Sequence, residues 1–184
     1  MAPTSTDNRN VYLIGPMGSG KTAVGKRLAR VLHLTFYDSD AEIEERTGVD
    51  IPYIFEKEGE AGFREREREA IDALTRLDGV VLATGGGAVL AQENRERLAS
   101  RGRVVYLQTS VAQQLERTKH GRHRPLLRTA DPESKLRELM AHREPLYQSI
   151  AAVTVSTDGR NVRAVADEIV LRLRQLSAHT ACDA

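Results

Sequence analysis

Apolar residues fall along this chain in short blocks that predict strands, with longer amphipathic stretches between them. Apolar runs that stop at glycine or polar residues predict buried strands at residues 11–14, 34–37, 80–83, 103–107 and 153–156. Apolar residues recur at helical spacing from Thr22 to Leu32, from about Pro132 to Tyr147 and from Val162 to Leu176. Strands that alternate with crossover helices predict an α/β fold, in which helices cover both faces of a parallel sheet.

The stretch from Asp40 to Leu77 is rich in charge and mostly helical in pattern. Asp50 can cap a helix that carries Pro52 in its first turn, and Gly59 and Gly62 interrupt the pattern. The longer helix that follows is expected to bury one apolar face, formed by Phe63, Ala70, Leu74 and Leu77.

A length of 184 residues suits one compact domain, and we expect a single domain over residues 1–184. Residues 1–9 and 177–184 are expected to be flexible tails. The segment at about 119–131 is aperiodic and basic, which predicts a mobile loop.

The composition and charge of the chain indicate which partners and which compartment to expect. The formal net charge is +1, from 27 basic and 26 acidic residues, and this balance gives no support for a nucleic-acid binder. The single cysteine, Cys182, cannot form an internal disulfide. The polar first residues do not resemble a signal peptide, and no apolar run has the length of a bilayer span. We therefore expect a cytoplasmic monomer that acts on small molecules and binds neither nucleic acid nor membrane.

The segment Gly15-Pro16-Met17-Gly18-Ser19-Gly20-Lys21-Thr22 fits the phosphate-binding loop (P-loop) pattern, and it lies between a predicted strand and a predicted helix. Its glycines allow backbone N–H groups to turn toward phosphate oxygens, and the helix directs its N-terminus at the same anion. Lys21 can bring positive charge to the β and γ phosphates, and the Thr22 hydroxyl can ligate the Mg²⁺ that accompanies the nucleotide. A glycine-rich turn that binds nothing is the alternative, and the flanking elements favour the phosphate site.

Two carboxylates, Asp38 and Asp40, directly follow the second predicted strand. Ligands of open parallel sheets bind beyond the carboxyl ends of the strands. One carboxylate can support Mg²⁺ through water, while the other accepts hydrogen bonds from a hydroxylated substrate. Asp40 can equally serve as the cap of the helix that follows.

Glycines and arginines add further candidates. Gly85 to Gly87 follow the third predicted strand and leave backbone N–H groups open to a ligand, with a plain flexible turn as the alternative. Arg64, Arg124 and Arg143 carry forked guanidinium groups that match carboxylates and phosphates, although most arginines are solvated surface residues. Arg124 lies in the basic loop before a proline and two leucines, which suits a lid over a triphosphate.

Together these motifs resemble those of the shikimate kinases. Six stretches occur in the order of that family, from residue 11 to about residue 160: Gly-Pro-Met-Gly-Ser-Gly-Lys-Thr, Phe-Tyr-Asp-Ser-Asp, Gly-Phe-Arg-Glu-Arg-Glu, Leu-Ala-Thr-Gly-Gly-Gly, Arg-Pro-Leu-Leu and Arg-Glu-Pro-Leu-Tyr. The resemblance implies a three-layer α/β/α fold of the nucleoside-monophosphate-kinase type, with a five-stranded parallel sheet. It also implies transfer of a phosphoryl group from ATP to the 3-hydroxyl of shikimate, a step toward chorismate and the aromatic amino acids.

The resemblance also implies roles for the matching residues. Asp40 would bond the ring hydroxyls of shikimate, and Arg64 and Arg143 would bind its carboxylate. Gly86 would contact shikimate through its backbone. ATP would be contacted by Gly18, Ser19, Gly20, Lys21, Thr22, Ala23, Arg117, Arg124 and Arg160. Mg²⁺ would be held by Thr22 and supported by Asp38, and the catalytic residues would be Lys21, Asp40 and Arg124. Residues of about 40–68 would form the substrate-binding region and about 119–131 the lid.

Other functions stay open from the residues alone. A kinase of similar build could act on gluconate or a nucleoside monophosphate, although Arg64 and Arg143 favour a carboxylated polyol. A nucleotide-dependent switch would leave these arginines and Asp40 without a role. Asp40 either removes the proton of the attacking hydroxyl or only orients it, because a loose transition state needs little activation of the nucleophile.

Overall fold

The computed structural model describes residues 10–119 and 129–182. Arg124, predicted as a lid residue, lies outside the described residues, as does the expected tail at 1–9. The strands within the described ranges are β1 (Val11–Ile14), β2 (Thr35–Asp38), β3 (Val80–Ala83), β4 (Arg103–Gln108) and β5 (Val153–Ser156). The helices there are α1 (Lys21–Leu32), α2 (Ser39–Thr47), α3 (Ile51–Thr75), the short 3-10 helix η1 (Ala88–Leu90), α4 (Gln92–Arg101), α5 (Val111–Thr118), α6 (Pro132–Ile150) and α7 (Val162–Cys182).

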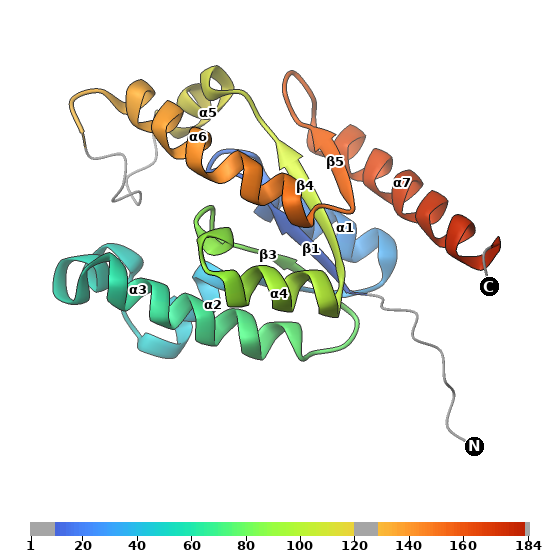
Figure 1. Cartoon of the computed structure of the whole chain (residues 1–184), viewed down its shortest axis with the longest axis horizontal. Helices are drawn as coiled ribbons and strands as arrows, with labels where there is room; N and C mark the ends of the chain where they lie inside the picture. Colours follow the sequence, from blue (N-terminus) through green and yellow to red (C-terminus); the bar gives the residue numbers. More distant parts are fainter. Residues whose placement is uncertain (1–9, 120–128, 183–184) are drawn as a thin grey trace.

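The strands form one parallel sheet in the order β2-β3-β1-β4-β5, as expected from the sequence (Figure 1). β1 lies at the centre and pairs with β3 on one side and with β4 on the other. The P-loop follows β1, the Asp38–Asp40 segment follows β2 and the three glycines follow β3. Because the carboxyl ends of parallel strands meet at one edge of a sheet, three neighbouring strands deliver these three motifs to the same place.

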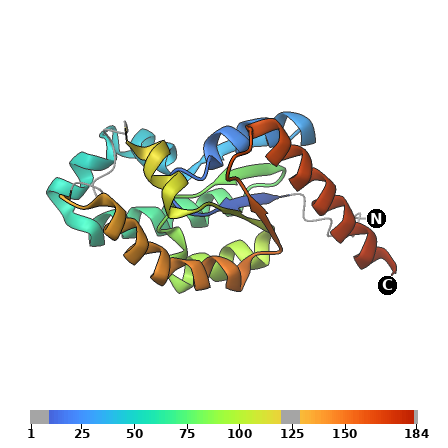
Figure 2. The same cartoon turned by 90° about the horizontal axis from the view of Figure 1, so that it is seen from above.

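Each face of the sheet has its own hydrophobic core, because successive strand residues point to opposite faces. Leu13 of β1 packs in a core with residues of α1 and α7, whereas Tyr12 and Ile14 pack with residues of α3, α4 and α6. Figures 1 and 2 show α1 and α7 on one face and α4 and α6 on the other. The three-layer α/β/α architecture expected from the sequence is therefore confirmed.

A third core joins α2 to α3 beside the sheet, and it contains Ile43, Ile54, Phe63 and Ala70. The Asp50 side chain accepts a hydrogen bond from Tyr53 N and caps α3, as predicted. Gly59 has a φ of 71°, a non-helical conformation that kinks α3 after its second turn. Gly62, by contrast, does not interrupt the helix.

Three details differ from the sequence prediction. Leu77 follows the end of α3 and is 39% exposed, so it does not extend the buried face. Helix α4 was not expected, because its sequence is mostly polar and buries only Asn94 and Leu98. Helix α7 continues through the expected tail to Cys182, since no glycine or proline follows Leu176 to end it.

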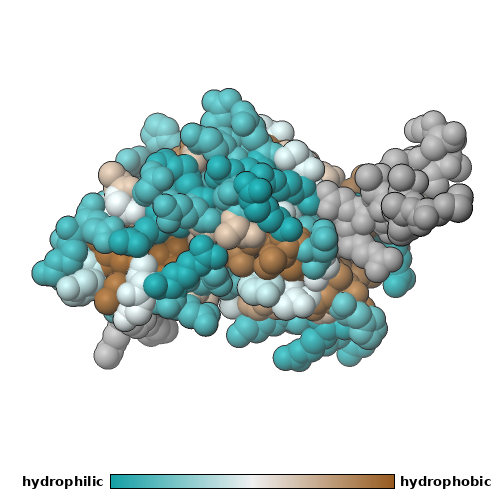
Figure 3. All heavy atoms as spheres, turned by 90° about the horizontal axis from the view of Figure 1, so that it is seen from below, coloured by the Kyte–Doolittle hydropathy of each residue, from teal (hydrophilic) through white to brown (hydrophobic). Residues whose placement is uncertain are grey.

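Hydrophilic residues cover most of the face drawn in Figure 3. Figure 3 shows one face of the molecule, on which hydrophobic side chains are visible between hydrophilic ones. In the described part of the chain, no helix combines the length and the apolar character of a membrane span.

Candidate active site

The P-loop curls around its own lysine. Gly15, Gly18 and Gly20 have φ angles of 145°, 75° and 88°, a region that residues with a side chain rarely adopt. Lys21 Nζ donates hydrogen bonds to Gly15 O at 2.8 Å and to Pro16 O at 2.7 Å. The ammonium group therefore lies over the concave side of the loop, at the N-terminus of α1, where an anion is favoured.

Asp38 connects the P-loop to the second strand. Its Oδ2 accepts a hydrogen bond from Thr22 Oγ1 at 2.7 Å, and its Oδ1 accepts one from Asp40 N at 3.0 Å. Asp38 is therefore the cap of α2, and the alternative in which Asp40 caps that helix is wrong. The hydroxyl and carboxylate oxygens of Thr22 and Asp38 are hard ligands of the kind that Mg²⁺ prefers, so this pair fits the predicted metal contact.

Asp40 projects from the first turn of α2 into a largely enclosed position. Its Oδ1 is buried and has no hydrogen-bond partner among the described residues. Burial raises the pKa of Asp40 to about 7; the negative charges of Asp38 and Glu67 add to this rise, and Lys21 and Arg64 oppose it. A carboxyl with this pKa is ready to accept a hydrogen bond, or a proton, from a ligand hydroxyl at neutral pH.

Glu67 completes the acidic part of the site, and the sequence analysis did not identify it. It is 1% exposed, and its Oε2 accepts a hydrogen bond from Arg64 Nη1 at 2.7 Å. Its other oxygen is buried without a partner among the described residues, and burial raises its pKa although Arg64 lowers it. Its spacing of three residues from Arg64 on α3 is the one signal in the sequence that places the two side chains together.

Two arginines face this acidic pair from different helices. Arg64 of α3 also donates to Glu60 Oε1 at 3.0 Å, so it is held between two carboxylates. Arg143 of α6 is 4% exposed, and its charge lowers the pKa of Glu67. Arg64 gives three of its five N–H groups to Glu60 and Glu67, so it keeps donors that can bind a further anion.

Each glycine of the triple-glycine loop (residues 85–87) faces a different part of the site. A Cβ added at Gly85 would lie 2.7 Å from Glu67 Oε1 and 2.8 Å from Asp40 Oδ1. One added at Gly86 would lie 3.3 Å from Met17 N, and one added at Gly87 would lie 2.4 Å from Arg64 Nη2. None of the three has a positive φ. The loop therefore lacks side chains because site residues approach its backbone closely, and the alternative of a plain flexible turn does not explain it.

Replacing Gly87 with alanine is expected to displace the Arg64 guanidinium, because the new Cβ would overlap the flexible end of that side chain. A lost hydrogen bond to a charged group costs about 1.5–3 kcal/mol, so the KM for a carboxylate-bearing acceptor should rise about 10- to 100-fold. The KM for ATP and the melting temperature should change little. Steady-state kinetics with either substrate varied would test this, and an unchanged acceptor KM would contradict it.

On the nucleotide side, the two arginines predicted near the adenine differ. Arg117 of α5 donates to Gly18 O at 3.0 Å and to Thr157 O at 2.9 Å, so it lies directly beside the P-loop. Arg160 is bound to Glu168 at 2.5 Å on α7 and is not among the residues that line the cavity. The structure therefore brings Arg117 into the site but not Arg160.

A single cavity of about 650 Å³ unites most of the predicted donor residues with the predicted acceptor residues. Its lining includes Gly18, Gly20, Lys21, Thr22, Ala23, Asp38, Asp40, Arg64, Glu67, residues 85–87, Arg117 and Arg143. Ser19 is buried beneath the loop and bonds Lys21 at 3.3 Å. The volume is that of a typical small-molecule site.

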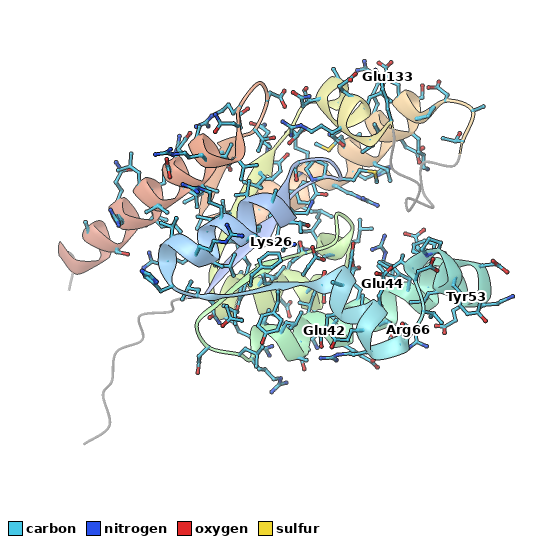
Figure 4. The ribbon with its side chains drawn as sticks, turned by 180° about the vertical axis from the view of Figure 1, so that it is seen from behind. Lys26, Glu42, Glu44, Tyr53, Arg66 and Glu133 are labelled. Carbon is cyan, nitrogen blue, oxygen red and sulfur yellow. The ribbon has the colours of Figure 1, made fainter. Side chains whose placement is uncertain are left out.

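Many other charged residues of α2 and α3 form local ion pairs instead. Glu42 pairs with Arg46, and Arg66 pairs with Glu58. Figure 4 labels Glu42 and Arg66. None of these four residues lines the cavity. Charge content alone would not have separated them from Arg64 and Glu67.

Comparison with known proteins finds similar sequences in one family. The family model "Shikimate kinase" matches residues 17–174. A shikimate kinase of Pseudomonas syringae pv. tomato is 58% identical over 168 residues, which cover 91% of this chain and 98% of that protein. A shikimate kinase of Halorhodospira halophila is 56% identical over 174 residues, 95% of this chain and 98% of that protein.

Solved structures extend the comparison to the fold. The shikimate kinase from Acinetobacter baumannii in complex with shikimate has a TM-score of 0.89 and 51% identity, covering 90% of this chain and 93% of that one. A gluconokinase from Sinorhizobium meliloti has a TM-score of 0.62 at 17% identity, which shows a shared fold alone. The family model and the relatives span nearly the whole chain, and the chain belongs to the shikimate kinase family.

Proposed function

We propose that this protein transfers the γ-phosphoryl group of ATP to the 3-hydroxyl of shikimate, giving ADP and shikimate 3-phosphate. One observation carries the proposal: a single cavity joins a P-loop to an acidic pair and two arginines. A small hydroxylated acid needs carboxylates for its hydroxyl groups and guanidinium groups for its carboxylate. The names of the relatives support shikimate as that acid.

At the donor end, the P-loop would hold the β and γ phosphates through its backbone N–H groups and Lys21. Lys21 now bonds Gly15 O and Pro16 O, and it would exchange these contacts for phosphate oxygens. Arg117, beside Gly18, would contact the nucleoside, and Arg124 remains a predicted contact of the transferring phosphate.

Thr22 and Asp38 would hold Mg²⁺, directly and through water respectively. When bound, Mg²⁺ supplies positive charge that neutralises the β and γ phosphates. Asp38 would keep its cap of α2 through Oδ1, which leaves Oδ2 and the Thr22 hydroxyl for the metal and its waters.

At the acceptor end, Arg64 and Arg143 would bind the carboxylate of shikimate, and the Gly86 backbone would contact the ring. Glu67 would hold Arg64 in place, since the two are joined at 2.7 Å. Asp40 Oδ1, which lacks a partner among the described residues, would accept the hydrogen bond of the attacking hydroxyl and then its proton. Phosphoryl transfer depends mainly on in-line positioning and charge neutralisation, which this arrangement supplies.

A coupled assay of ADP release tests the proposal, with shikimate, gluconate and nucleoside monophosphates offered side by side. We expect stimulation by shikimate alone, and its loss when a chelator removes Mg²⁺. Absence of stimulation by shikimate would reject the assignment, and stimulation by gluconate would favour the other small-molecule kinase.

A further inference from the structure

Tyr147 of α6 is fully buried, at 0% exposure, and does not line the cavity. Its hydroxyl donates a hydrogen bond to Gly86 O at 2.5 Å. Its ring stacks on that of Tyr106 in β4, with 5.0 Å between centroids and 22° between planes. The ring is therefore part of the hydrophobic core, whereas the hydroxyl reaches the back of the triple-glycine loop.

Arg143 precedes Tyr147 by one turn of α6, and its charge acts on the same hydroxyl. Burial raises the pKa of Tyr147 to about 12, and the positive charge of Arg143 opposes this rise. The phenol is thus protonated at neutral pH and donates its hydrogen bond to Gly86 O. Arg143 itself lies close to Gly86, since a Cβ added at that glycine would lie 3.7 Å from Arg143 Nη1, and both residues line the cavity.

The bond to Gly86 O fixes the orientation of a whole peptide unit. The peptide between Gly86 and Gly87 is trans, so its C=O and N–H point in opposite directions. With the C=O held by Tyr147 in the core, the Gly87 N–H points away from the core. Glycine has more accessible backbone conformations than any other residue, so a glycine peptide without such an anchor has little to hold its plane.

We propose that Tyr147 is a positioning residue, which orients the Gly86–Gly87 peptide, beside the Arg143 guanidinium, for the carboxylate-bearing acceptor. The inference rests on the proposed function, and it concerns how the acceptor end is held. Tyr147 itself does not reach the acceptor.

Tyr106 provides a matched control. Its hydroxyl is buried and has no hydrogen-bond partner among the residues that the structure describes. Tyr106→Phe and Tyr147→Phe remove the same atom from two stacked rings of one core. Only the second change removes a hydrogen bond to the site.

In steady-state assays, Tyr147→Phe is expected to raise the KM for shikimate about tenfold, the effect of losing one hydrogen bond of typical strength. Its kcat and its KM for ATP should stay within about twofold of the wild type, because the P-loop and Asp40 have no contact with this hydroxyl. Tyr106→Phe should leave all three constants within the same range.

A second readout does not depend on turnover. In protein labelled with ¹⁵N-glycine, the amide signals of Gly86 and Gly87 should shift in Tyr147→Phe and exchange faster with solvent, and Tyr106→Phe should change them little. An unchanged shikimate KM and unchanged amides in Tyr147→Phe would overturn the proposal. Equal effects of Tyr147→Phe and Tyr106→Phe would also overturn it. The same holds if both KM values, kcat and the melting temperature change together in Tyr147→Phe. If shikimate does not stimulate ADP release by the wild type, the proposed function fails, while the amide signals still test the positioning role.

Discussion

Replacing Lys21 with methionine is expected to lower kcat by about 10³-fold, the upper range for removing one preorganised group that stabilises transition-state charge. Methionine keeps most of the length and apolar volume of lysine but carries no charge. The ammonium group now lies over the P-loop carbonyls of Gly15 and Pro16, where the phosphates would bind. We therefore expect ATP binding to weaken less than turnover, because the charge acts mainly on the transferring group.

Lys26→Met is the matched control for this variant. Lys26 lies on the same helix, α1, and its side chain is exposed outside the cavity (Figure 4). It should retain the kcat and both KM values of the wild type. Coupled ADP release measures both variants, and normal turnover in Lys21→Met would overturn the assignment of the P-loop itself.

Replacing Asp40 with asparagine is expected to lower kcat about 100-fold, at the low end of what a positioned general base contributes. Asparagine keeps the shape of the side chain and can still accept a hydrogen bond through its oxygen, but it cannot take a proton. A variant that kept nearly full kcat and lost only affinity for shikimate would show that Asp40 orients the hydroxyl and does not act as its base.

The pH dependence gives a second test of Asp40. Its pKa is raised to about 7 by burial and by the charges of Asp38 and Glu67. The base must be deprotonated to act, so kcat/KM for shikimate should rise with pH and level off above about 7. Asp40→Asn should lose this inflection, whereas Asp167→Asn, an exposed change on α7, should keep it.

The free energy of unfolding should also depend on the protonation of Asp40, but it should fall as pH rises, whereas kcat/KM rises. The folded-state pKa of Asp40 lies above its ordinary value of 3.8, so the folded protein binds this proton more tightly than the unfolded chain. The contribution of Asp40 to the free energy of unfolding is therefore largest at low pH and is lost as pH rises from about 4 to about 7. Asp40→Asn should flatten this dependence in denaturant titrations, and a dependence equal to that of the wild type would contradict the raised pKa.

The local sequence predicted most of the fold because its signals are short in range. The apolar runs located all five strands of the sheet to within a residue or two, and Asp50 was recognised as a helix cap from its own neighbours. The predictions that failed were those in which local pattern carries little information. Helix α4 has almost no apolar period, and α7 has no residue near Leu176 that would end it.

The candidate site was predictable where one motif contains the chemistry. The P-loop, Asp38, Asp40, Arg64 and Arg143 were chosen by residue type and position after strands, and one cavity is lined by these four side chains and by much of the P-loop. Arg160 was not separable from other arginines by sequence, and the structure pairs it with Glu168 outside that cavity.

The sequence by itself determined the P-loop, the parallel α/β sheet and the candidates for donor and acceptor, because each depends on residues that are close along the chain. Only the tertiary structure decided what joins them. Glu67 became part of the site through its burial beside Asp40 and Arg64, and the triple-glycine loop became explicable through the side chains that approach it from α2 and α3. Such contacts depend on distances between separate elements, and those distances are fixed by packing against the sheet rather than by spacing in the sequence.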